Sequence, residues 1–119
     1  MIDTLQNLCD VISARKEGGD PDSYTVYLFR EGLDKILKKC GEECSEVIIA
    51  AKSLQAAEGS APSDGKADDL KNEICDLLYH LLVLMADRGI PLADIETILR
   101  ERAGKIGNLK TFKTTDKDS

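Results

Sequence analysis

GLDKILKKCGEECSEVIIAAK, residues 32–52, carries the strongest structural pattern in the sequence. Apolar residues recur in it with the period of an α-helix, and the pattern predicts one long helix over residues 33–57. Three carboxylates, Glu42, Glu43 and Glu46, crowd beside its apolar face. Like charges three or four positions apart repel, and burying them is costly, so this crowding requires a chemical explanation. The predicted apolar face consists of Leu33, Ile36, Leu37, Cys40, Cys44, Val47, Ile48 and Ala51.

The remaining segments also carry helical patterns, and no run of residues is typical of a strand. We predict helices over residues 2–15, 23–30, 66–88 and 92–103, the second of them capped by Ser23. The connector 58–65 is short, so the two long helices should pack antiparallel. The predicted fold class is all-α: one domain over residues 1–106, a helical bundle with two long antiparallel helices. Residues 107–119 form a polar tail that we expect to be disordered.

Two stretches are apolar on nearly every side of their predicted helices: VIIAA (47–51) and LLYHLLVLM (77–85). A helix that is apolar all round must be covered all round. A handful of short helices can hardly provide this cover, so we expect a homo-oligomer, a dimer or a higher assembly, to complete the bundle. The alternative is a compact monomer that buries both stretches by itself.

Composition narrows the classes of partner. The net charge of the 119 residues is −6, which argues against nucleic acid as a partner because phosphate backbones require a basic footprint. A small polyphosphate stays compatible if a divalent cation inverts the local charge. The N-terminus is acidic and does not resemble a signal peptide, and LLYHLLVLM is too short to span a bilayer, so we expect no membrane partner.

Four cysteines occur at apolar helical positions, and none belongs to a CxxC pair: Cys9, Cys40, Cys44 and Cys75. A zinc site made of the last three and His80 is one interpretation. The missing ligand spacing favours the other, in which all four are reduced core residues. Reduced thiols predict a cytoplasmic location.

The acids form one stripe on each long helix. Lys39, Glu43 and Glu46 lie at i, i+4 and i+7 along the first, whereas Asp69, Glu73, Asp76 and His80 follow the second. Antiparallel packing would bring Glu43 and Glu46 opposite Glu73 and Asp76. Four converging carboxylates call for a hard divalent cation, Mg²⁺ or alternatively Mn²⁺. From spacing alone, two solvated acidic faces are an equally good interpretation.

The acidic pattern has a known counterpart. EExxE (Glu42, Glu43, Glu46) followed by ExxD (Glu73, Asp76) is similar to the signature of the MazG-like all-α nucleotide pyrophosphohydrolases. Within that superfamily, the segments 23–29, 32–52 and 73–95 closely resemble the phosphoribosyl-ATP pyrophosphohydrolase family, which acts in histidine biosynthesis. The resemblance covers residues 20–100 or so, which is most of the chain.

The resemblance implies hydrolysis of phosphoribosyl-ATP between its α- and β-phosphates. It implies Glu43, Glu46, Glu73 and Asp76 as Mg²⁺ ligands, and Glu42 as a further ligand or as a base. Either Glu42 or Glu46 would take the proton of the attacking water. No other cofactor is implied.

Two lysines, one histidine and three tyrosines are further candidates for contact with the substrate. Lys39 shares the acidic stripe and is the first candidate for a phosphate contact, and Lys35 is the second. Their alternative role is to solvate the surface or to pair with a nearby glutamate. For His80 we favour a hydrogen bond to a neighbouring acid at the rim of the core over a phosphate contact. For the tyrosines Tyr24, Tyr27 and Tyr79 we favour burial over stacking on a base.

Two alternative functions stay open. A housecleaning pyrophosphatase for free nucleoside triphosphates would use the same metal site, but such relatives usually carry a Trp-containing segment before the acids. This chain has no Trp and has SYTVYLF (23–29) at that place. A non-catalytic helical interaction module would use the acids only for solubility.

Overall fold

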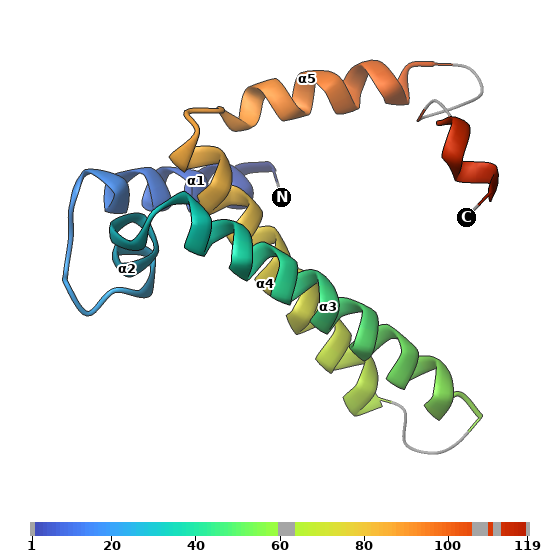
Figure 1. Ribbon diagram of the computed structural model, residues 1–119. Helices are drawn as coiled ribbons and strands as arrows, with labels where there is room; N and C mark the ends of the chain where they lie inside the picture. Colours follow the sequence, from blue (N-terminus) through green and yellow to red (C-terminus); the bar gives the residue numbers. More distant parts are fainter. Residues whose placement is uncertain (1, 60–63, 106–109, 111–112, 119) are drawn as a thin grey trace.

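The chain folds into helices only, as far as the structure describes it. The computed structural model describes residues 2–59, 64–105, 110 and 113–118, and this part of the chain contains no strand (Figure 1). The predicted all-α fold class is therefore confirmed. The elements are α1 (Ile2–Glu17), α2 (Tyr24–Glu31), α3 (Leu33–Ala57), α4 (Asp64–Asp87), α5 (Leu92–Ala103) and the short 3-10 helix η1 (Thr114–Asp118).

The predicted helix boundaries agree closely with the observed ones. Helices α3 and α5 have the predicted bounds, whereas α1 continues two residues further, to Glu17, and α4 begins two residues earlier, at Asp64. Residues 60–63 of the predicted connector lie outside the described residues. Within the polar tail, where no regular structure was expected, Thr114–Asp118 form η1. No helix in the described part of the chain has the length and hydropathy needed to cross a membrane.

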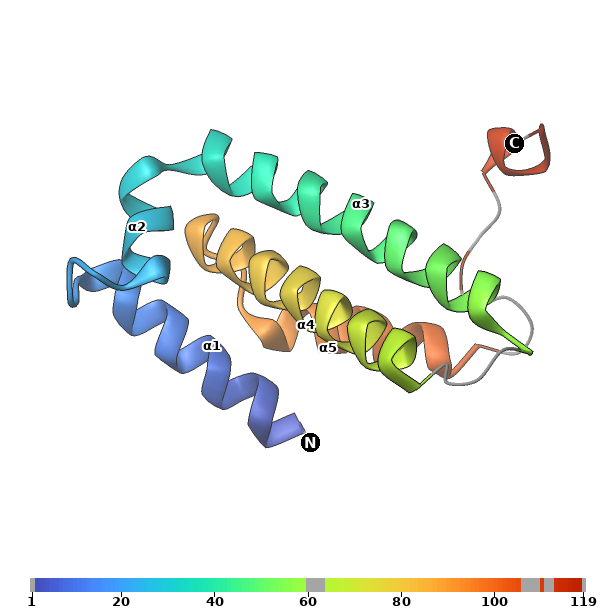
Figure 2. The ribbon, with the colours of Figure 1, turned by 90° about the horizontal axis from the view of Figure 1, so that it is seen from below.

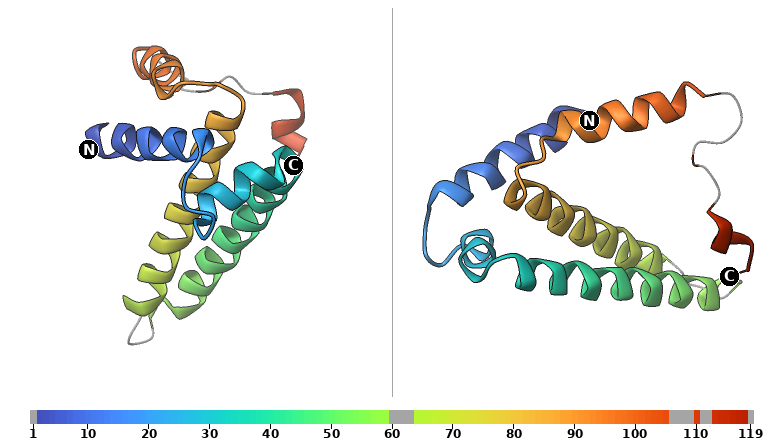
Figure 3. Two further views of the ribbon diagram at one scale, coloured as in Figure 1. Left: turned by 90° about the vertical axis from the view of Figure 1, so that its left-hand side faces the viewer. Right: turned by 45° about the horizontal axis from the view of Figure 1, so that its top comes forward.

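Helices α3 and α4 lie side by side and antiparallel, and they form a long hairpin (Figures 1 and 2). Helices α1 and α2 pack against the end of the hairpin where α3 begins and α4 ends, and α5 leads away from that end (Figure 3). The buried apolar residues gather there and come from all five helices: Ile12, Leu28, Ile36, Cys40, Leu82, Val83 and Leu92.

The junction between α2 and α3 is set by two local features. Ser23 precedes α2, and its hydroxyl accepts a hydrogen bond from the Val26 backbone N–H, which confirms the predicted cap. Gly32 separates α2 from α3 with φ of 95°, a conformation that other residues rarely adopt. The chain can therefore change direction within one residue, which brings α2 against the start of the hairpin.

The far half of the hairpin has little cover. Among the described residues, no apolar side chain of α3 beyond Cys40, and none of α4 before Leu82, is fully buried. The radius of gyration is 17.2 Å, against about 13.5 Å for a compact chain of this length. The single chain is thus extended, and large apolar side chains on its hairpin stay exposed: Leu37, Ile48, Ile49, Ile74, Leu78 and Leu81.

Candidate metal and active site

Three carboxylates from the two hairpin helices meet where the hairpin leaves the core. Glu43 of α3 and Glu73 and Asp76 of α4 each offer an oxygen, and these oxygens lie within 4.8 Å of one another. Glu43 follows Ile36 and Cys40 at i+7 and i+3, so the helical period that buries those two residues also carries its carboxylate into the α3–α4 interface. The structure thus brings together three of the four predicted metal ligands.

Burial leaves two of these acids without the hydrogen bonds that they need. The Glu43 residue is only 6% exposed. Oε2 of Glu43 and Oε2 of Glu73 are both buried and have no hydrogen-bond partner in the structure. An unpaired buried carboxylate oxygen is unfavourable, so this arrangement points to a ligand that accepts electron pairs from several oxygens at once.

The fourth predicted ligand, Glu46, acts on both of these carboxylates. The pKa of Glu43 is raised to about 7, chiefly by burial and next by contact with the Glu46 carboxylate. For Glu73 the larger cause is the contact with Glu46, which raises the pKa above its ordinary value, with burial second. Glu46 therefore borders the three-oxygen group, although its own oxygens are not part of that group.

The residues present fit a hard divalent cation. All the donors are carboxylate oxygens, they come from two facing helices, and two of the residues hold a buried oxygen without a hydrogen-bond partner. A cation would remove the repulsion that raises the pKa values of Glu43 and Glu73. Oxygen donors alone do not separate Mg²⁺ from Mn²⁺.

Glu42 lies in different surroundings from Glu43, its neighbour in sequence. It is exposed and accepts a hydrogen bond from Lys39 Nζ at 3.0 Å, and this bond lowers the pKa of Glu42. Nζ of Lys39 also lies 3.9 Å from Oε1 of Glu43. Lys39 therefore links the exposed acid to the buried cluster, in the manner of the predicted pairing with glutamates. Lys35 Nζ lies 5.9 Å from the centre of the Tyr27 ring.

The structure corrects the prediction for His80. This residue is buried rather than at the rim, and neither of its partners is an acidic side chain. Nδ1 lies 2.7 Å from the backbone oxygen of Asp76, and Nε2 lies 2.9 Å from the Tyr24 hydroxyl. The prediction of three buried tyrosines is wrong for Tyr24, which is 45% exposed. Its ring forms part of a cavity wall, as described below.

The prediction for the cysteines is right for Cys40, which is buried, and wrong for Cys44 and Cys75, which are exposed. Cys9 is half-buried, and all four thiols are free. Cys44 lies on the same uncovered surface of α3 as Leu37 and Ile48, so the helical pattern identified an apolar face that the single chain does not bury. The cysteines do not contribute to the three-oxygen group.

Residues 5–103 match the phosphoribosyl-ATP pyrophosphohydrolase family. The chain belongs to this family. Curated relatives agree over nearly the whole length. The phosphoribosyl-ATP pyrophosphatases of Clostridium novyi (strain NT) and Listeria monocytogenes serotype 4a (strain HCC23) are each 47% identical over 109 residues, covering 92% of this chain and 89% and 94% of theirs. That of Bacillus cereus (strain AH820) is 44% identical over 116 residues, 98% of each chain.

The family resemblance predicted from the acidic pattern is therefore confirmed, as is the prediction of a hydrolase of this family. The acids that carried the prediction, Glu42 to Glu46 and Glu73 to Asp76, all lie within the matched residues. The roles of the individual residues and the identity of the cation stay predictions.

Two features beside the acid cluster were not predicted from the sequence. The first is a cavity of about 310 Å³ beside the acids, which Ser53 and Lys66 line together with Glu46 and Glu73. Lys66 lies in the first turn of α4, and its position one turn before Asp69 was the available signal. The second is the link between Tyr24 and His80, which joins residues 56 positions apart. No pattern in a single sequence indicates such a pair.

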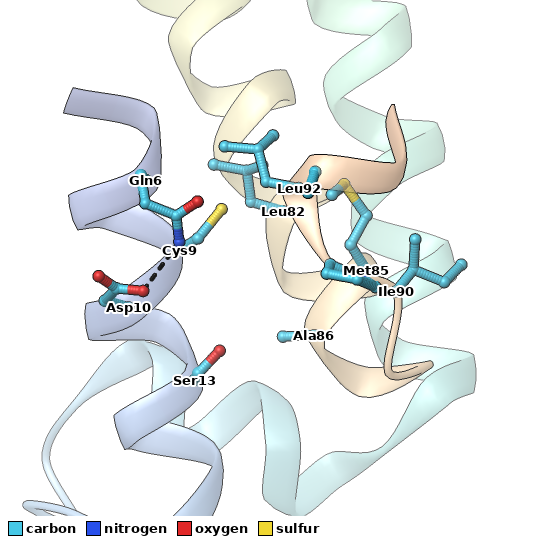
Figure 4. Close-up of a pocket in the computed structure, with 11 residues that line it drawn as sticks. Gln6, Cys9, Asp10, Ser13, Leu82, Met85, Ala86, Ile90 and Leu92 are labelled. Carbon is cyan, nitrogen blue, oxygen red and sulfur yellow. Dashed lines mark hydrogen bonds between the residues drawn. The ribbon is translucent and has the colours of Figure 1, made fainter. Parts of the chain in front are cut away.

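A separate cavity of about 180 Å³ lies between α1, the end of α4 and the start of α5 (Figure 4). Leu82, Met85 and Leu92 form its apolar side, and Gln6, which donates to Asp10, faces them from α1. None of the clustered acids lines this cavity. The acid cluster, rather than this cavity, is therefore the candidate active site.

Proposed function

We propose that this chain hydrolyses phosphoribosyl-ATP to phosphoribosyl-AMP and pyrophosphate in histidine biosynthesis, with Mg²⁺ at the acid cluster. Family membership over residues 5–103 supports the substrate. The observation that carries the proposal is the group of three carboxylate oxygens within 4.8 Å, two of whose residues hold buried oxygens without partners. A solvated acidic face would leave those oxygens in water.

Glu43, Glu73 and Asp76 would hold the ion, with Glu46 completing the set. A Mg²⁺ ion bound there would supply positive charge for the polyphosphate and would lower the pKa of a bound water that attacks the anhydride. The rigid α3–α4 interface fixes these carboxylates before the substrate arrives. The leaving group is pyrophosphate, and the nucleotide product keeps the α-phosphate.

The proton of the attacking water must go to a carboxylate that the ion does not fully occupy. Glu42 and Glu46 both meet this condition, since neither belongs to the three-oxygen group. Glu42 is exposed, and the hydrogen bond from Lys39 lowers its pKa, so it carries its charge at neutral pH as an ordinary carboxylate does. Lys39 and Lys35 supply further positive charge for the phosphates, and both line one cavity with Glu42.

The first test is pyrophosphate release from phosphoribosyl-ATP, compared with release from ATP and deoxynucleoside triphosphates, in Mg²⁺ and in EDTA. We expect release from phosphoribosyl-ATP in Mg²⁺ only, because the ionised acids repel a polyphosphate when no cation is present. Release mainly from free triphosphates would instead establish the housecleaning function. A lack of release from every substrate would leave only the non-catalytic interaction module.

We also propose that two copies of the chain pack through an outer apolar face, defined by Leu37, Cys44 and Ile48 of α3 and Ile74, Leu78 and Leu81 of α4. All six side chains are exposed in the single chain. The extended shape supports this proposal, because a large radius of gyration is typical of a chain whose core is completed by another copy. A dimer is the smallest assembly that covers the face.

The free thiols support a cytoplasmic location.

Ile48→Glu is expected to convert the assembly to monomers, because Ile48 is 64% exposed in the single chain and a charge there would be buried by a second copy. Sedimentation or light scattering gives the mass. Val11→Glu is the matched control, since Val11 is also exposed but lies on α1, outside the outer apolar face. A wild-type protein of monomer mass at micromolar concentration would refute the proposal.

A further inference from the structure

Tyr24 combines an open ring with a fixed hydroxyl. The residue is 45% exposed, yet its hydroxyl lies 2.9 Å from Nε2 of His80, which is only 5% exposed. Nδ1 of His80 lies 2.7 Å from the Asp76 carbonyl oxygen. A carbonyl only accepts, so Nδ1 carries the proton, and in the neutral ring Nε2 accepts the Tyr24 O–H. The chain thus orders a side chain that it leaves accessible to solvent.

The open ring belongs to a cavity of about 220 Å³ whose lining is aromatic and cationic. Tyr24, Tyr27, Lys35, Lys38, Lys39 and Glu42 line it. The two tyrosine rings are stacked, with centroids 6.1 Å apart and planes at 26°. The cavity on the other side of the acids, by contrast, has no aromatic lining residue among those described.

This aromatic cavity adjoins the acid cluster. Lys39 is its link, since Nζ lies 3.0 Å from Glu42 and 3.9 Å from Glu43. His80 is a second link, because the backbone oxygen that holds it belongs to Asp76. The aromatic wall of the cavity is therefore followed by ammonium groups, and these are followed by the carboxylate cluster. A phosphorylated nucleoside with a cation on its phosphates has the same sequence of groups.

We infer that Tyr24 contacts the base of the nucleotide substrate and that His80 is the residue that positions it. The inference rests on the proposed function. His80 Nδ1 donates to the Asp76 carbonyl, and the Tyr24 hydroxyl donates to His80 Nε2. These two bonds hold the Tyr24 ring in place before binding, so less side-chain freedom is lost when a base stacks on it. The lysines of the cavity face the phosphate end of the same molecule.

The test compares Tyr24→Leu with Tyr79→Phe. Tyr79→Phe removes another tyrosine hydroxyl that joins α2 to α4, through Thr25, and Tyr79 does not line the cavity. For Tyr24→Leu we expect KM for phosphoribosyl-ATP to rise at least about fivefold, the smaller cost of losing one base–aromatic stack. The turnover number should change less than KM, and Tyr79→Phe should leave KM unchanged. An unchanged KM in Tyr24→Leu would overturn the inference.

His80 is tested by a pair of variants. His80→Leu removes the acceptor for the Tyr24 hydroxyl, and we expect a higher KM; His80→Gln retains an acceptor and should restore much of the affinity. Equal KM values for the two variants would refute the positioning role. Calorimetric binding of AMP to wild type and to Tyr24→Leu keeps the inference testable without catalysis. If the wild type releases no pyrophosphate, the proposed function fails. Weaker AMP binding by Tyr24→Leu would still support a contact between Tyr24 and the base. Equal AMP binding by the two proteins would overturn that contact.

Discussion

Glu43→Gln is expected to lower the rate of Mg²⁺-dependent pyrophosphate release by more than about 100-fold, because even outer-shell partners of a metal typically contribute 10- to 100-fold. The amide has the size of the carboxylate but lacks its charge. Glu43 is buried and its Oε2 has no protein partner, so the substitution should weaken cation binding rather than destabilise the fold. The turnover number at saturating substrate and Mg²⁺ is the measurement.

Glu101→Gln is the matched control for Glu43→Gln. It makes the same chemical change at an exposed position of α5, outside the acid cluster, and should leave the rate unchanged. A second readout separates cation binding from chemistry: Mg²⁺ should raise the melting temperature of the wild type but much less that of Glu43→Gln, by linkage. If Glu43→Gln keeps both its rate and its Mg²⁺ response, the acid cluster is not the metal site.

The two adjacent glutamates show why the crowding at residues 42–46 is not simple repulsion. Successive residues on a helix point about 100° apart, so Glu42 faces solvent and Lys39 while Glu43 enters the α3–α4 interface. Their pKa values consequently move in opposite directions, down for Glu42 and up for Glu43. Glu42 therefore stays ionised beside Lys39, whereas Glu43 loses its proton only at higher pH or when a cation replaces that proton.

Periodicity predicted this part of the molecule because the relevant contacts are local or follow from one antiparallel pair. The bounds of α3 and the meeting of Glu43 with Glu73 and Asp76 needed only the helical repeat and a short connector. The exposure of Cys44 was not predictable in the same way. A helical pattern indicates which residues share a face, whereas their burial depends on which surface covers that face.

The contact between Tyr24 and His80 could not be predicted from the helical period, for a different reason. It depends on the angle at which α2 meets α4, which Gly32 and the cap at Ser23 set, and on the rotamers of two side chains. The acidic stripe correctly placed His80 one turn after Asp76. It did not indicate that the ring would bond to the backbone of Asp76 instead of to a carboxylate.

Without metal, the stability of the folded chain is expected to depend strongly on pH. The folded-state pKa of Glu43 is raised from 4.5 to about 7, and that of Glu73 is raised as well. The folded chain therefore holds protons that the unfolded chain has released, so the contribution of these acids is complete below about pH 4.5 and is lost as the pH rises through 7. In EDTA, we expect the melting temperature of the wild type to fall between pH 5.5 and pH 8.

Glu43→Gln isolates this contribution from other titrations. The amide cannot ionise, so metal-free Glu43→Gln should melt higher than metal-free wild type at pH 8, by about 4 °C for each 1 kcal/mol relieved. The difference should shrink as the pH falls and vanish below about pH 4.5. Mg²⁺ should stabilise the wild type more at pH 8 than at pH 5.5, because the cation competes with the protons for the same oxygens. Equal melting temperatures for the two metal-free proteins at pH 8 would contradict the raised pKa of Glu43. Glu43→Gln should therefore be less active than the wild type but, without metal, more stable than it at pH 8. This combination is expected where function, rather than folding, requires the buried acid.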